Sequence, residues 1–336
     1  MVLLAAGCAR GIRRRAAVFA ACALAWGIAA QAQTQTQTQA FPSRPIRMIV
    51  PIAAGGATDA MGRLIAQRLA DQLGVGVVVD NRPGAGTVIG TEIAARAAAD
   101  GYTLMTVAPE FVINPGLRKL PYDPIKDFSF ITQLASGQYY LSTHPLVPVK
   151  SIREFVALAR ARPGQITFGS SGNGSANHLA GELFQHLTGT KMIHVPYKGA
   201  GPAAAALIGG QIDFMFSNIA SAIPHIRSGK LRAIAVTGER RAQVSPEVPT
   251  VVESGVPGFV VTGFFLLMAP AGTPREIVAR LNAESVKALQ TPAMRETLAQ
   301  LGLEPVTSSP EDTTRFVQAE IARWSAVIKA AAVQAD

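Results

Sequence analysis

The chain has 336 residues, of which 49% are hydrophobic and 16% are charged. Charged residues make up about a quarter of an average soluble domain, so this composition predicts a folded protein and excludes disorder for most of the chain. The length allows two domains, and the net charge of +9 means that nucleic-acid binding must be judged from where the basic residues lie.

Residues 1–32 have the order of a secretory signal peptide. Four arginines between positions 10 and 15 precede an apolar run at 16–30, and the small-residue sequence Ala-Gln-Ala follows. The run is shorter than the roughly 20 residues that a membrane-spanning helix needs. The rest of the chain has no basic cluster that would follow a phosphate backbone. We therefore expect export, a soluble mature protein and no binding of nucleic acid.

Both cysteines, Cys8 and Cys22, lie within the predicted signal peptide. The mature chain would contain none, so disulfides, thiolate catalysis and Cys-ligated zinc are not expected. Residues 33–41, which are mostly alternating Gln and Thr, have little apolar surface to bury and are predicted to form a flexible tether.

From Pro45 onward, short apolar runs alternate with Gly-rich turns and amphipathic segments. Strands are expected at 46–52, 75–79 and 102–107, with helices at 59–73 and 87–99 between them. This βαβαβ order is typical of a mostly parallel sheet covered by helices.

A second series of the same kind begins near residue 140. The expected strands are 165–169, 192–196, 212–217 and 231–237, and the expected helices are 151–162, 177–187, 202–208 and 220–227. A strand-like run at 259–268 is followed by a helix that Thr273 would cap, and by helices at 292–301 and 310–333. We expect an α/β protein with two lobes, in which residues 42–138 and 255–336 form lobe 1 and residues 139–254 form lobe 2. The chain would cross between the lobes near 135–141 and 240–262.

The sequence lacks the common motifs of catalytic and cofactor-binding sites. The sequence contains no P-loop, no His-Glu-x-x-His and no Gly-x-Ser-x-Gly. The glycines at 84, 86 and 90 are spaced one residue too long for a dinucleotide fingerprint. His178, Glu182 and His186 would share one helix face, but the helix rise places the outer two about 12 Å apart, too far to share one metal ion. We expect no cofactor and no metal.

Three glycine-rich loops connect a predicted strand to the start of a predicted helix. They are Ala53–Asp59, Ser170–Asn177 and Pro196–Pro202. Unpaired N–H groups and the helix dipole favour an anion at such a helix start, and ligands of open α/β sheets bind at the carboxyl ends of strands. The loops therefore predict a cleft that holds a small anion through backbone amides from both lobes. The alternative is that they are only well-capped turns.

Nine motifs in order resemble the substrate-binding proteins of tripartite tricarboxylate transporters, also called Bug receptors. The motifs are PIAAGGATD (51–59), DNRPGAGTVIG (80–90), DGYTL (100–104), GNGSANHLAGELF (172–184), VPYKGAGP (195–202), GGQIDFMF (209–216), SGKLRAIAV (228–236), VPTVVE (248–253) and APAGTP (269–274). The resemblance implies the type II periplasmic-binding-protein fold and a monomeric periplasmic receptor. Such a receptor closes two lobes on a small organic acid and delivers it to a permease with one large and one small membrane subunit.

The resemblance also implies which residues bind the ligand carboxylate. Carried over by motif, lobe 1 would use Gly55, Gly56, Thr58 and Asp59, and lobe 2 would use Ser171, Asn173, Gly174, Ser175 and His178, with Tyr197 and Lys198 nearby. Ser217 and Asn218, at the end of a strand, are further candidates. Because a carboxylate would repel the ligand, we expect Asp59 to cap its helix and orient the Gly55-Gly56 loop, or to accept a hydrogen bond from a ligand hydroxyl or a water.

Two segments depart from the family pattern. Phe264-Phe265-Leu266 stands where the family usually has an aromatic pair with Trp followed by Gly, and Glu110 lies in a predicted loop where small polar residues are common. If Glu110 faces the cleft, it disfavours a second ligand carboxylate and favours an aromatic or amide-bearing monoacid. Two other functions stay open: a receptor that signals to a sensor protein without transport, and a periplasmic enzyme on the same scaffold.

Overall fold

The strands of both predicted series join in one network in the computed structural model, which describes residues 41–333. The strands are β1 (Ile46–Val50), β2 (Val77–Asn81), β3 (Thr103–Val107), β4 (Phe128–Thr143), β5 (Thr167–Ser170), β6 (Ile193–Pro196), β7 (Phe214–Asn218), β8 (Arg232–Val236), β9 (Thr262–Pro270) and β10 (Glu304–Pro305). The helices are α2 (Ala57–Leu73), α3 (Val88–Ala95), α4 (Glu110–Leu117), α5 (Ile152–Ala161), α6 (Ala176–Thr188), α7 (Ala200–Ile208), α8 (Ile219–Arg227), α9 (Arg275–Leu289), α10 (Pro292–Gln300) and α11 (Pro310–Ala331). The predicted signal peptide and nearly all of the predicted tether lie outside the described residues.

The α/β fold class is confirmed, but the sheet is mixed. The strand order is β2-β1-β3-β9-β4-β7-β5-β6, in which β2, β1 and β3 are parallel and β7, β5 and β6 are parallel. β9 and β4 run antiparallel to their neighbours in the middle of this order. The expectation of mostly parallel sheets holds for the two βαβ series and is wrong for the strands between them. Those strands come from the long segments that link the two series, and no helical crossover forces them to be parallel.

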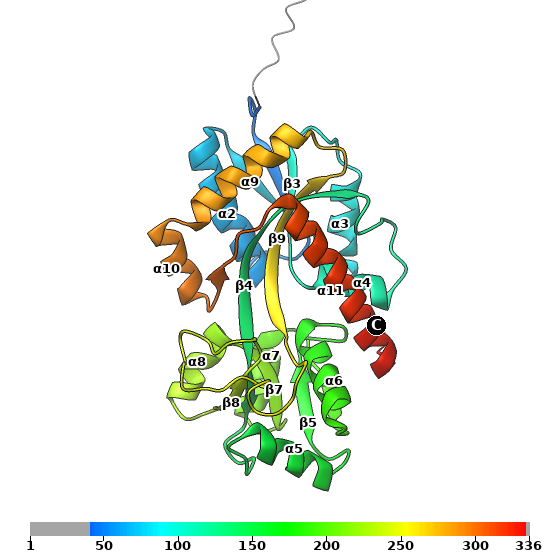
Figure 1. Cartoon of the computed structure of the whole chain (residues 1–336), viewed down its shortest axis with the longest axis vertical. Helices are drawn as coiled ribbons and strands as arrows, with labels where there is room; N and C mark the ends of the chain where they lie inside the picture. Colours follow the sequence, from blue (N-terminus) through cyan, green and yellow to red (C-terminus); the bar gives the residue numbers. More distant parts are fainter. Residues whose placement is uncertain (1–40, 334–336) are drawn as a thin grey trace, which may run out of the picture. The chain divides into compact units, whose positions relative to one another are not determined.

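Strand β4 is the main element that the sequence did not predict. It has 16 residues, and its neighbour changes partway along: Gln138 pairs with Thr262 of β9, and Tyr139 pairs with Asn218 of β7. Figure 1 shows β4 and β9 running between the two lobes. The change of partner falls within the predicted crossover at 135–141.

Several predicted helix starts are confirmed by their capping contacts. The hydroxyl of Ser151 accepts the Glu154 N–H at the start of α5, and Ser309 accepts the Asp312 N–H at the start of α11. Thr273 does not cap α9, because its hydroxyl donates to the Pro270 carbonyl and Pro274 takes the N-cap position. The predicted helix at 87–99 is shorter, since α3 ends at Ala95.

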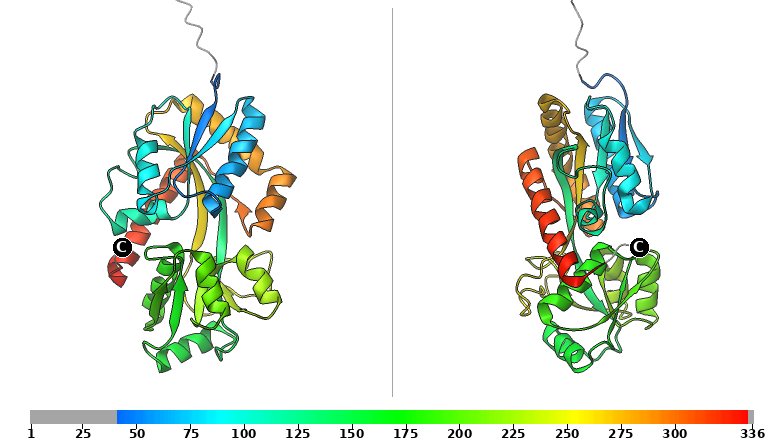
Figure 2. Two further views of the ribbon diagram at one scale, coloured as in Figure 1. Left: turned by 180° about the vertical axis from the view of Figure 1, so that it is seen from behind. Right: turned by 90° about the vertical axis from the view of Figure 1, so that its right-hand side faces the viewer.

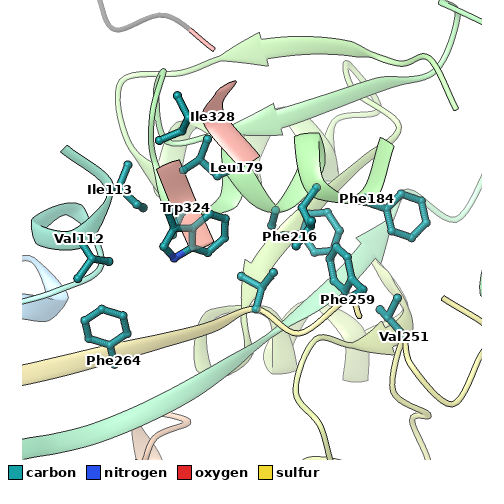
Figure 3. Packing of buried hydrophobic residues seen from close by; sticks show 14 of the residues in the cluster. Val112, Ile113, Leu179, Phe184, Phe216, Val251, Phe259, Phe264, Trp324 and Ile328 are labelled. Atoms are coloured by element: carbon teal, nitrogen blue, oxygen red, sulfur yellow. The ribbon is translucent and has the colours of Figure 1, made fainter. Parts of the chain in front are cut away.

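The C-terminal helix α11 packs against elements that are far apart in the sequence. It contacts α4 and β4 and also α6, and Figure 2 shows it lying along one side of the central strands. Trp324 of α11 is 1% exposed, and Figure 3 shows it with Ile113 of α4, Leu179 of α6 and Ile328 around it. One apolar cluster therefore includes side chains of α4, α6 and α11. No helix within residues 41–333 is both long and apolar enough to span a membrane.

Candidate functional site

A pocket of about 180 Å³ lies where α6, α7 and α8 begin. Its lining includes Ala176, the first residue of α6, Ala200, the first residue of α7, and Asn218, the N-cap of α8. The helix starts converge because β6, β5 and β7 are parallel, so their carboxyl ends lie at one edge of the sheet. Helix starts present N–H groups without intrahelical acceptors and the positive end of the helix dipole. This wall of the pocket suits an anion.

Asn177 organises the loop that precedes α6. Its Oδ1 atom accepts hydrogen bonds from the Ser171 N–H at 3.2 Å, from the Ser171 hydroxyl at 3.1 Å and from the Ser175 hydroxyl at 2.7 Å. Because a backbone N–H can only donate, the contact with Ser171 fixes which end of the amide is the oxygen. The Nδ2 group is left as a donor in a side chain that lines the pocket and is 7% exposed. Asn177 was not among the predicted ligand-binding residues, and nothing in the loop sequence Ser170–Asn177 distinguishes it from the other polar residues there.

The lining also carries an acid. Glu110 is the first residue of α4, and Tyr139 is the β4 residue at which the strand changes partner. Burial raises the pKa of the Glu110 carboxyl above its ordinary value. Burial, and then the nearby charge of Glu110, raise the pKa of the Tyr139 phenol. Glu110 therefore faces the pocket, from a helix and not from the expected loop.

Two of the other predicted residues also line this pocket, and one of them lacks a partner. Ser217 is 4% exposed, and its hydroxyl makes no hydrogen bond to any described residue. Asn218 accepts the Ala220 N–H through Oδ1 and so caps α8. Ser171, Ser217 and Asn218 are thus the predicted site residues that line the pocket.

The Gly55-Gly56 loop is not part of the lining. Gly55 has a φ of +92°, and its N–H donates to Oδ2 of Asp59 at 2.9 Å. Asp59 also accepts from Nε of Arg63 at 3.0 Å and from Nδ2 of Asn81 at 2.9 Å. Burial alone would raise the pKa of Asp59, but these hydrogen bonds outweigh it and hold the pKa below its ordinary value. The contact with Gly55 shows that Asp59 orients this loop, while Gly56 and the buried Thr58 begin α2 beside it.

His178 contacts the loop before α6 through a hydrogen bond and does not line the pocket. Its ring is 6% exposed, Nδ1 accepts the Gly174 N–H at 3.0 Å, and Nε2 lies 3.5 Å from Oε1 of Glu182. Since Nδ1 is an acceptor, the proton of the neutral ring is on Nε2. Ser175 caps α6 by accepting the His178 N–H. No cluster of His, Cys, Asp or Glu in the described part of the chain could hold a metal ion.

The remaining predicted residues lie outside the pocket lining. The Tyr197 N–H donates to the Ser170 carbonyl and so joins the third loop to the second, while Lys198 is exposed and Asn173 is half-buried. Phe264 is 1% exposed and packs edge to face on Phe316 with ring centroids 5.0 Å apart. It belongs to the core and not to the site.

Comparisons with known proteins agree with this architecture. Residues 61–333 match the model of the "Tripartite tricarboxylate transporter family receptor". The chain is 41% identical to Protein BugT of Bordetella pertussis over 292 residues, which cover 86% of this chain and 90% of BugT.

Two solved structures from Rhodopseudomonas palustris were determined with organic acids. One, with adipate, is 37% identical and has a TM-score of 0.78, covering 88% of this chain and 99% of that protein. The other, MatC with bound malate, is 35% identical and has a TM-score of 0.74, covering 86% of this chain and 100% of MatC. The chain belongs to the tripartite tricarboxylate transporter receptor family.

Proposed function

We propose that this protein is a periplasmic receptor without enzymatic activity, which captures a small organic carboxylate and delivers it to a large and a small permease subunit in the membrane. The convergence of α6, α7 and α8 at one pocket carries the proposal. Hydrogen bonds to a charged group contribute about 1.5 to 3 kcal/mol each, so a few preorganised donors are enough for micromolar binding, which needs about 8.2 kcal/mol. The relatives solved with adipate and malate support the same class of ligand.

In this proposal the ligand carboxylate binds against Ser171, Asn177, Ser217 and Asn218 in lobe 2. The amide of Asn177 donates to it, and the unpartnered hydroxyl of Ser217 gains a hydrogen-bond partner. A buried hydroxyl without a partner costs about 1 to 3 kcal/mol, and a ligand that hydrogen-bonds to it recovers that cost.

Closure of the lobes brings in the rest of the predicted site. Lobe 1 is assigned residues 42–138 and 255–336, lobe 2 is assigned residues 139–254, and the change of partner in β4 supports the boundary at 138. Gly55, Gly56 and Thr58 would then approach the ligand from lobe 1. A ligand that contacts both lobes favours the closed state by its greater affinity for that state.

A thermal-shift screen of organic acids followed by calorimetry tests the proposal. A ligand present at 100 times its dissociation constant should add about 2.7 kcal/mol to the free energy of unfolding. The free acid should bind, and its methyl ester should bind at least tenfold more weakly, because the ester has lost the charge that the helix starts recognise. Equal affinity for acid and ester would contradict recognition of a carboxylate.

A further inference from the structure

The pocket lining contains groups of two chemical kinds. The three helix starts and the amide of Asn177 offer hydrogen-bond donors. The lining also contains Glu110 of α4 and Tyr139 of β4, which pairs with Asn218 in the sheet. A ligand in the pocket therefore meets both donors and an acid.

No positive charge compensates Glu110 within the protein. No Lys or Arg in residues 41–333 forms an ion pair with its carboxyl, and the pocket lining contains neither residue type. Burial opposes ionisation of Glu110 more than the hydrogen bond from its own backbone N–H favours it, as the direction of its pKa shift shows. Removing a carboxyl from water costs free energy, and a further hydrogen-bond donor reduces that cost.

A second carboxylate at this position would be unfavourable. Two carboxylates in contact in a partly desolvated site repel each other unless one of them binds a proton. An ammonium, amide or hydroxyl group would instead donate a hydrogen bond to Glu110. An acceptor atom on the same ligand group could also take a hydrogen bond from the phenol of Tyr139.

We propose that Glu110 determines the ligand specificity of this receptor by accepting a hydrogen bond from an N–H or O–H group that the ligand carries in addition to its carboxylate. The ligand is then a monocarboxylate with a donor group, and unsubstituted dicarboxylates are discriminated against. This inference rests on the proposed function, since it assumes that the helix starts of lobe 2 hold the carboxylate.

Matched probe sets test the inference. Each set shares one carbon skeleton and consists of a monocarboxylate, the corresponding terminal dicarboxylate and the monoamide of that dicarboxylate, for example hexanoate, adipate and adipic acid monoamide. Sets built on butyrate and on 4-methylbenzoate vary the length and shape. Calorimetry gives the dissociation constants for the wild type, for Glu110→Gln and for Glu296→Gln, which makes the same change on the exposed surface of α10.

We expect the wild type to bind the monoamide about tenfold or more tightly than the dicarboxylate in every set that binds. Glu110→Gln should remove or reverse this preference, because glutamine also offers an N–H donor to a second carboxylate. Glu296→Gln should leave the preference unchanged. The order of affinities in the wild type tests the inference even if Glu110→Gln does not fold.

Three outcomes would overturn the inference. Tighter binding of the dicarboxylates by the wild type would mean that Glu110 is protonated and donates to a second carboxylate, and the proposed function would stand. If Glu110→Gln still preferred the monoamide to the dicarboxylate, Glu110 would not determine the ligand specificity. If no organic acid from the screen or the probe sets bound any of the three proteins, the proposed function would fail, and this inference with it.

Discussion

The imidazole rings of His178 and His194 stack face to face, with centroids 3.7 Å apart and 8° between their planes. Each ring also holds part of the loop that leads into α6. His178 accepts the Gly174 N–H, and Nε2 of His194 lies 2.6 Å from the Ser170 hydroxyl. The pair therefore fixes the loop that carries Ser171 into the pocket.

Replacement of His178 by alanine should destabilise this loop. The buried Gly174 N–H would lose its acceptor, which alone costs about 1 to 3 kcal/mol in the free energy of unfolding. Urea denaturation measures the loss, and ligand affinity should fall as well. His186→Ala changes an exposed histidine of the same helix and is the control. Equal stability of the two variants would show that the stacked pair does not support the loop.

Asn177→Asp should separate ligand binding from folding. The aspartate keeps an oxygen for the three hydrogen bonds that Oδ1 accepts, but it replaces the Nδ2 donor with a negatively charged oxygen. We expect the free energy of unfolding to change by less than about 1 kcal/mol and the affinity for an organic acid to fall about 100-fold or more.

Asn282→Asp is the control, because it should change stability and not ligand affinity. Nδ2 of Asn282 donates to the carbonyls of Ile131 and Ser308, away from the pocket lining. This variant should lose stability and keep its affinity in the same urea and calorimetry experiments. Retained affinity in Asn177→Asp would place the carboxylate elsewhere.

Asp59 should make stability depend on acidity. Its pKa is lowered in the folded state by the hydrogen bonds that outweigh burial, so the ionised form stabilises the fold. This contribution is fully present above the unfolded pKa of about 3.9 and is lost as the pH falls through the lower folded pKa.

Asp59→Asn should therefore be less stable than the wild type at neutral pH, and the difference should shrink as the pH drops below about 4. Urea unfolding at a series of pH values measures this difference. Asp71→Asn, in the same helix with a side chain that is 53% exposed, should show little pH-dependent difference. If the difference in the free energy of unfolding between the wild type and Asp59→Asn did not change with pH, the pKa of Asp59 would not be lowered in the folded state.

Trp324→Ala should weaken the contact of α11 with both lobes. A buried Trp replaced by Ala usually costs about 3 to 5 kcal/mol, because a cavity remains. The indole also donates to Oε2 of Glu320 at 2.9 Å. Thermal and urea unfolding should show this loss, while Gln318→Ala on the exposed face of the same helix should have little effect. A loss below about 1 kcal/mol would mean that α11 contributes little to the core between the lobes.

The sequence by itself determined the local parts of this protein. Capping residues such as Ser151 and Ser309 act on N–H groups three positions away, so their effect can be predicted without knowing the fold. The two βαβ series, the loops before α6 and α7, and the family could be predicted for the same reason, because each rests on short stretches of chain.

Only the tertiary structure decided which residues share the pocket. Glu110 and Tyr139 lie on different elements, and they meet the starts of α6, α7 and α8 because β4 changes partners at Tyr139 and because β5 and β7 are parallel neighbours. Because of the same long-range pairing, Asn177 lines the pocket and His178 does not, although the two are adjacent in sequence. These positions depend on strand order and on packing between residues far apart in sequence. The spacing of residues within a short segment therefore does not predict them.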